Sequence, residues 1–218
     1  MSVHFPDSNA TFIHVPKTGG TSFYEWIKRN IPVYDQQSDN RYALSCVDGA
    51  KAQWGDLGTV FTFVRNPYSR LVSMYHYQYA KATEHIQRKE QFFKHPLPMK
   101  YTDYLKIIAV SSKGFDYWLE CVYFQKKELF SVHDASPETM TVSSWLNGTV
   151  PDIIIKTEEL NTEFYKISDL LTSGLCKDPL PWINTTEHRP YRDYYNAKTI
   201  GWVAEQFRDD LEMFGYQF

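Results

Sequence analysis

TFIHVPKTGGTS, at residues 11–22, places a strand, a glycine turn and a helix start in immediate succession. The run 11–15 is β-branched and aromatic, which favours a short buried strand. Gly19 and Gly20 then let the backbone turn and come close to a ligand. A helix that begins near Thr21 directs its unpaired N–H groups, and the positive end of its dipole, at an anion. The stretch therefore predicts a strand-loop-helix unit whose loop binds phosphate.

Lys17 adds a cation to this loop, and its position distinguishes the loop from that of ATPases. In ATP-binding phosphate loops the lysine follows the glycines, in the order GxxxxGK and then Ser or Thr. Here Lys17 precedes Gly19. A lysine beside two glycines also fits an ordinary turn with a solvated lysine, and a second segment helps to separate these two interpretations.

VFTFVRNPYSRLVS, at residues 60–73, is again a strand that runs into a helix. Asn66 suits the N-cap of this helix and Pro67 its first position. Arg65 then lies at the carboxyl end of the strand, where ligands bind in parallel α/β sheets. Ser73 lies two turns into the helix. A guanidinium and a hydroxyl at this end of the sheet are suited to a second phosphate.

The two segments together resemble the donor site of sulfotransferases that use 3′-phosphoadenosine 5′-phosphosulfate (PAPS). PKTGGTS at 16–22 is similar to the 5′-phosphosulfate loop of that family, and Arg65 with Ser73 is similar to its 3′-phosphate site. The likeness is greatest to the carbohydrate sulfotransferases of the Golgi, which act on heparan and chondroitin. YRDYY at 191–195 and FGYQF at 214–218 also resemble that group. The resemblance covers nearly the whole chain, with a middle third that is only loosely similar.

The rest of the pattern alternates strands with helices, which is typical of a three-layer α/β fold with a central parallel sheet flanked by helices. Strands are expected at 11–15, 42–46, 59–65 and 152–156. Helices are expected at 21–30, 48–54, 67–81, 101–109, 115–130, 158–172 and 197–214. The chain has 218 residues, of which 43% are hydrophobic, and no linker rich in Pro, Gly or Ser. We therefore expect a single sulfotransferase domain over residues 1–218 with a P-loop-like fold.

The resemblance implies a role for each residue of the donor site. Lys17 is implied to be both catalytic and cofactor-binding, because it neutralises the oxygen between the sulfur and the 5′-phosphate. The cofactor-binding loop would consist of Lys17, Thr18, Gly19, Gly20, Thr21 and Ser22. Arg65 and Ser73 would bind the 3′-phosphate and select PAPS over ATP. Arg189 and Tyr191 belong to the late loop that closes over the nucleotide in relatives, and are expected to contact the adenosine or its phosphate.

The resemblance does not supply the general base. Many relatives have a histidine where an ungapped comparison gives Ala43, and alanine accepts no proton. Other relatives use a glutamate after the loop, and that window holds Asp39, with Asp35 and Asp48 as alternatives. A partly buried carboxylate can accept the proton of a hydroxyl, although each of these aspartates also fits a solvated loop or a helix cap. His14, in the first strand, is interpreted as a structural histidine.

The composition limits the cellular compartments and the binding partners that we expect. A net charge of −3 argues against general binding to nucleic acid or to a membrane surface. The cysteines Cys46, Cys121 and Cys176 have no metal-site spacing and are interpreted as reduced thiols. No signal peptide or membrane span is evident, which favours a cytoplasmic enzyme. Animal carbohydrate sulfotransferases usually carry a membrane anchor, so a trimmed chain would instead belong in the Golgi lumen.

The expected acceptor is a hydroxyl on a glycan or glycolipid, and no metal is expected. Residues 81–100 include five basic side chains and two acidic ones, a patch that suits an anionic glycan or is simply a solvated surface. The basic residues are Lys81, Arg88, Lys89, Lys94 and Lys100, and the acidic ones are Glu84 and Glu90. Two alternatives remain: a non-catalytic relative that binds PAPS, its product 3′,5′-ADP or a glycan, and a small-molecule kinase. The oligomeric state is not indicated.

Overall fold

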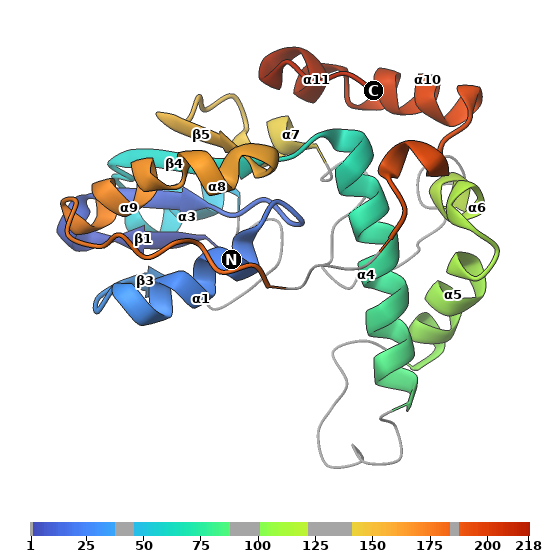
Figure 1. The fold of residues 1–218 in the computed structure, drawn as a ribbon, viewed down its shortest axis with the longest axis horizontal. Helices are drawn as coiled ribbons and strands as arrows, with labels where there is room; N and C mark the ends of the chain where they lie inside the picture. Colours follow the sequence, from blue (N-terminus) through green and yellow to red (C-terminus); the bar gives the residue numbers. More distant parts are fainter. Residues whose placement is uncertain (1, 38–45, 88–100, 122–140, 184–187) are drawn as a thin grey trace.

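The computed structural model describes residues 2–37, 46–87, 101–121, 141–183 and 188–218 (Figure 1). The described residues form a five-stranded sheet in the order β3-β1-β2-β4-β5. The strands are β1 (Val3–Phe5), β2 (Ala10–Ile13), β3 (Asp35–Gln36), β4 (Thr59–Val64) and β5 (Ile153–Lys156). The helices are η1 (Pro6–Ser8), α1 (Gly20–Asn30), α3 (Val47–Trp54), α4 (Pro67–Gln87), α5 (Tyr101–Ser111), α6 (Phe115–Leu119), α7 (Val142–Leu146), η5 (Thr157–Glu159), α8 (Leu160–Glu163), α9 (Tyr165–Thr172), η6 (Tyr191–Tyr194), α10 (Ala197–Gln206) and α11 (Arg208–Phe214).

The α/β class is confirmed, and the sheet is mixed rather than wholly parallel. β2, β4 and β5 are parallel neighbours, as the two sequence segments predict. β1 pairs antiparallel with both β2 and β3. The turn η1 and Asn9, whose φ is 44°, fold β1 back onto β2. A three-residue strand is too short to show the alternation that identifies strands in a sequence.

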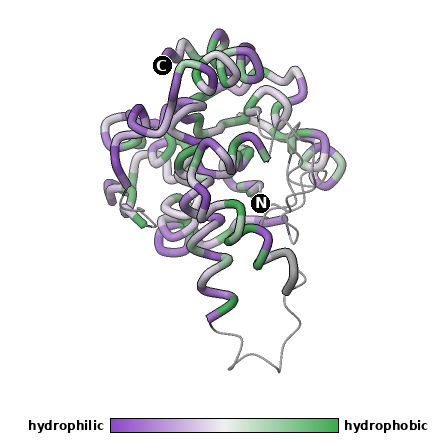
Figure 2. The backbone as a smooth tube through the Cα atoms, turned by 90° about the vertical axis from the view of Figure 1, so that its right-hand side faces the viewer, coloured by the Kyte–Doolittle hydropathy of each residue, from purple (hydrophilic) through white to green (hydrophobic). Residues whose placement is uncertain are grey.

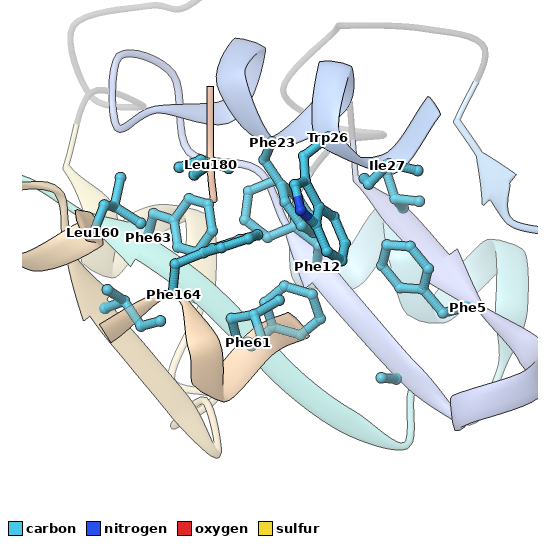
Figure 3. Packing of buried hydrophobic residues seen from close by; sticks show 14 residues of the cluster. Phe5, Phe12, Phe23, Trp26, Ile27, Phe61, Phe63, Leu160, Phe164 and Leu180 are labelled. Carbon is cyan, nitrogen blue, oxygen red and sulfur yellow. The ribbon is translucent and has the colours of Figure 1, made fainter. Parts of the chain in front are cut away.

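One face of the sheet carries an aromatic core. Side chains at alternate positions of β2 and β4, including Phe12, Phe61 and Phe63, point to this face because successive residues of a strand face opposite sides. Helix α1 covers them with Phe23 and Trp26. Figure 3 shows these rings packed together with Phe5, Phe164, Leu160 and Leu180. This core fixes α1, and with it the preceding loop, over the carboxyl end of β2.

The opposite face packs on α3, α7 and the end of α11. Ile13, Val60 and Val64 contribute from the strands, which are the positions between those of the aromatic face. A third cluster joins α4 to α6, α10 and the C-terminal residues beside the sheet (Figure 1). Figure 2 shows hydrophobic and hydrophilic residues interspersed along the helical segments, as helices with one buried face require.

Several element boundaries differ from those expected. The helix expected at 158–172 is divided into η5, α8 and α9, and the helix expected at 197–214 is divided into α10 and α11 at Phe207. Their apolar stripes still face the core, with Phe164 and Ile167 buried in one and Val203 and Phe207 in the other. The strand expected at 42–46, apart from Cys46, and most of the helix expected at 115–130 lie outside the described residues.

Candidate functional site

The loop between β2 and α1 is held rigidly from within. Thr18 is fully buried, and its Oγ1 donates to the Val15 carbonyl at 2.8 Å. Gly19 has a φ of 104°, a conformation that favours glycine. Gly20 lies against the His14 ring so closely that an added Cβ would be 2.2 Å from His14 Nε2. The two glycines thus serve different needs: the first a turn, the second a close approach.

Lys17 has an unfavourable backbone conformation, and its charged side chain is partly removed from water. Its φ is 69°, in the left-handed region that few side-chain-bearing residues adopt. The side chain is half-buried, and Nζ lies 3.9 Å from the centroid of the Tyr77 ring. Burial, together with the nearby cations Arg65 and Lys81, lowers the pKa of Lys17 to about 8. A cation whose charged neighbours are cations favours a bound anion.

Arg65, from the predicted 3′-phosphate site, lies close to Lys17, from the predicted 5′-phosphosulfate loop. It directly follows β4, and its Nη1 lies 3.5 Å from the Lys17 carbonyl oxygen. Its Nε donates to Ser69 Oγ at 3.0 Å, which orients the guanidinium along α4. Burial lowers the pKa of Arg65 while the Glu158 carboxylate opposes the shift. Ser73 is 7% exposed and lies one turn beyond Ser69 on α4.

Further side chains that brace the site were not identified from the sequence. Thr157 directly follows β5, and its Oγ1 lies 2.9 Å from the carbonyl oxygens of both Thr18 and Val64. Arg70 is 3% exposed, and its Nε donates to the Pro16 carbonyl at 2.9 Å. A threonine after a strand and an arginine in a helix are common, so no sequence signal marks either one. Together they tie the loop to β4, β5 and α4.

The first turn of α1 shows two different environments. Thr21 is exposed, whereas Ser22 is buried and its Oγ accepts a hydrogen bond from the Ile183 N–H at 3.2 Å. The neighbouring Trp182 is 60% exposed, and its Nε1 donates to Asn161 Oδ1 at 2.8 Å. A fixed, exposed indole thus lies close to the helix start. It is a further residue that sequence reasoning missed.

The late loop packs on α4. The His188 ring stacks on His76 at a centroid distance of 5.2 Å, and the Tyr194 hydroxyl is 2.8 Å from His76 Nε2. Burial lowers the pKa of His76, with His188 and Arg189 adding to the shift. Arg189 lies over the Tyr194 ring at 5.0 Å. The late loop therefore contacts α4 at His76, about one turn from Ser73.

Tyr191 belongs to the same late loop and packs against the C-terminal residues. Its ring packs edge-on to Phe218 at 5.9 Å, and Phe218 packs edge-on to Tyr68 at 4.9 Å. Asn66 caps α4 as expected, because its Oδ1 accepts from the Tyr68 N–H at 3.0 Å. The Asn66 Nδ2 donates to the Gln217 carbonyl at 2.8 Å. The C-terminal residues therefore contact the start of α4, next to Arg65.

The Glu158 carboxylate lies near Arg65. It accepts from the Asn66 N–H at 3.2 Å and from the Tyr216 hydroxyl at 3.0 Å. Burial and the Glu158 charge raise the pKa of the Tyr216 phenol, so this hydroxyl remains a proton donor. Glu158 thus joins the end of β5 to both α4 and the C-terminal segment.

The candidate bases have different positions. Asp39 and Ala43 lie outside the described residues. Asp48 is exposed in α3, and its Oδ2 accepts from Asn147 Nδ2 at 2.6 Å. Asp35 is exposed in the edge strand β3, opposite His4. His14 packs on Phe12 and Tyr24. The identity of the general base therefore stays a prediction.

The described residues show neither a metal site nor a membrane span. They contain no group of three or more His, Cys, Asp or Glu side chains arranged to hold a metal ion. Within the same residues, no helix is both long and apolar enough to cross a membrane. Of the basic patch at 81–100, only Lys81 and Glu84 have described side chains, and they pair at 2.8 Å.

A comparison with protein families gives one match. A family model described as "Sulfotransferase family" matches residues 2–217. No curated protein and no solved structure matches the chain. The matched range includes the loop, Arg65 and every described strand.

Proposed function

Because the chain belongs to the sulfotransferase family, we propose that it is an enzyme that transfers a sulfuryl group from PAPS to a hydroxyl of a carbohydrate acceptor. The observation that carries the proposal is the meeting of Lys17 and Arg65. They follow different strands, and Arg65 Nη1 reaches the Lys17 carbonyl at 3.5 Å. Two adjacent, partly buried cations suit a nucleotide that carries anionic groups at both its 5′ and 3′ positions.

The residues present fit the donor nucleotide. Lys17 and the N-terminus of α1 would hold the 5′-phosphosulfate, with the backbone amides from Thr18 to Ser22. Arg65 and Ser73 would hold the 3′-phosphate. Trp182 has a flat, exposed ring on which the purine would stack, and Arg189 of the late loop would contact the adenosine or its phosphate. When bound, PAPS supplies the activated sulfuryl group.

Catalysis would then be mainly positioning and charge stabilisation, as in phosphoryl transfer. Lys17 would stabilise the negative charge that develops on the leaving phosphate. The Ser22 hydroxyl accepts from Ile183, so it retains its proton for donation to an anion. The rigid loop, tied by Thr157 and Arg70, would keep these donors in place through the reaction.

Asp39 is the general base that we propose. Gln37, two residues before it, is bound at the edge of the sheet that carries the loop. Its N–H donates to the Ser2 carbonyl at 3.2 Å, and the Ser2 hydroxyl accepts from the His14 N–H at 3.2 Å. Gln37, the last described residue before Asp39, therefore lies level with the carboxyl end of β2. As the base, Asp39 would receive the proton of the acceptor hydroxyl.

The test is a transfer assay with PAPS labelled in the sulfate, against polysaccharides, glycolipids and small hydroxyl compounds. We expect transfer to at least one carbohydrate, and a loss of about 10²-fold or more in Lys17→Ala. Lys28→Ala is a matched control, because Lys28 is an exposed lysine at the other end of α1. Near wild-type turnover in Lys17→Ala would overturn the assignment. Binding of 3′,5′-ADP by the wild type without transfer to any acceptor would instead indicate a non-catalytic nucleotide-binding relative, consistent with Ala43.

A further inference from the structure

One face of α4 presents a side chain to the site at every turn. Ser69, Ser73, Tyr77 and Lys81 are four residues apart, and residues at this spacing share a helix face. Ser69 accepts from Arg65, and Tyr77 contacts Lys17. The Arg70 bond to the Pro16 carbonyl fixes the helix against the loop. Of these four residues, Tyr77 has no role in the proposed mechanism, although it touches the lysine on which that mechanism depends.

The contact between Lys17 and Tyr77 is that of a cation on an aromatic face. Nζ lies 3.9 Å from the ring centroid, well inside the range of about 6 Å in which the ring attracts a cation. Tyr77 is partly buried, and burial raises the pKa of its phenol. The ring therefore stays neutral at physiological pH. The nearby carboxylate of Glu84 is paired with Lys81 at 2.8 Å.

A neutral ring has an advantage over a carboxylate at this position. A carboxylate would pair with Lys17, neutralise the site and repel an anionic donor. The ring attracts the ammonium without adding a negative charge, and it leaves N–H donors of the ammonium available to a phosphate. An unheld lysine would instead lose side-chain freedom only when the ligand binds, and that ordering reduces affinity.

We propose that Tyr77 is a positioning residue whose ring holds the Lys17 ammonium at the anion site before the donor binds. The inference rests on the proposed function, because it assigns Tyr77 a part in binding the same nucleotide. Tyr77 acts through Lys17 and not on the sulfuryl group. Its effect is therefore on nucleotide affinity, and it requires the Lys17 side chain.

The test is a double-mutant cycle that measures 3′,5′-ADP affinity by calorimetry. Tyr77→Leu should weaken binding about three- to tenfold, and Tyr77→Phe, which keeps the ring, should restore wild-type affinity. In a Lys17→Ala background, Tyr77→Leu should cause no further loss. Tyr79→Leu is the matched control, because Tyr79 is an exposed tyrosine of the same helix. Tyr77→Met replaces Tyr77→Leu if thermal unfolding shows that the leucine variant is not folded.

The outcomes separate the two proposals. An equal loss of affinity from Tyr77→Leu in both backgrounds would show that the ring only packs α4, and would overturn this inference alone. Wild-type affinity in Tyr77→Leu would do the same. A wild-type protein that does not bind 3′,5′-ADP would overturn the proposed function, and this inference with it.

Discussion

Lys17 combines a left-handed backbone, partial burial and two cationic neighbours. Each of these raises the free energy of the folded protein, and a bound anion offsets the electrostatic part. The sequence predicts Lys17 and Arg65 as site residues because each follows a strand whose neighbours mark it clearly. It does not predict Tyr77, because one tyrosine among 16 carries no signal that it will meet a lysine 60 positions away.

The pKa of Lys17 gives a pH dependence with a definite sign. Its folded-state pKa is about 8, so the positive charge is present below pH 8 and is lost as the pH rises through that value. We expect the affinity for 3′,5′-ADP, measured by calorimetry from pH 7 to 9.5, to fall above pH 8 and to approach a tenfold loss per pH unit. Lys17→Arg should remove this fall, because arginine stays charged throughout the range. A parallel fall in Lys17→Arg would assign the titration to another group.

Replacing Gly20 by alanine should change the stability of the protein in the opposite direction to the same replacement at an ordinary helical glycine. An alanine Cβ at Gly20 would lie 2.2 Å from His14 Nε2, so Gly20→Ala should destabilise the protein by about 1–3 kcal/mol. Gly201, inside α10, has no atom within 4 Å of an added Cβ. Gly201→Ala should therefore stabilise the protein by up to about 1 kcal/mol. Urea unfolding measures both, and equal effects would contradict the close contact with His14.

At the scale of elements, the strand-loop-helix units are the part that the sequence predicts best. β2 with α1 and β4 with α4 lie where their alternation, glycines and caps indicate. The sequence pattern does not predict β1 or β3, nor the helix breaks at Phe164 and Phe207. An apolar stripe continues through such a break, so periodicity alone reports one long helix. Contacts between elements, such as those of Thr157, depend on which strands become neighbours and are not local properties of the sequence.

The Thr157 hydroxyl connects the ends of three parallel strands, and a substitution can test this connection. Its hydroxyl lies 2.9 Å from the carbonyls of Thr18 and Val64. Thr157→Val keeps the shape and leaves both carbonyls without this donor, so we expect a loss of about 1–3 kcal/mol in unfolding free energy. The affinity for 3′,5′-ADP should fall as well, because Thr18 belongs to the loop. Thr157→Ser keeps the hydroxyl and should retain most of both properties. If the serine and valine variants behave alike, the hydroxyl is not the link.

At the scale of the whole molecule, the site depends on residues from both ends of the sequence. Ser2 binds His14 and Gln37 beside the loop, and Gln217 binds Asn66 at the start of α4. The sequence of residues 214–218 does not by itself reveal which part of the fold this segment contacts. Its place becomes clear only once α4, β5 and the C-terminal residues are packed together.

Removal of residues 216–218 tests this long-range contact. It deletes the bonds to Glu158 and Asn66, and the Phe218 ring that packs on Tyr68. We expect a loss of about 2–4 kcal/mol in unfolding free energy. The affinity for 3′,5′-ADP should also fall, because Asn66 follows Arg65 directly. Met213→Ala, an exposed change in α11, is the control. An unaltered urea midpoint and affinity after the truncation would show that the segment does not support the site.

The 3.5 Å approach of Arg65 to the Lys17 carbonyl has a consequence for ligand selection. This contact would hold the two proposed phosphate positions at a nearly constant separation, so that a nucleotide phosphorylated at both ends would bind as a chelate. Once one phosphate is seated, the other is presented to its partner at a high effective concentration. A mononucleotide with a single phosphate gains no such advantage, however well that phosphate fits. The protein would thus select its donor by the distance between the two phosphates as well as by their charge.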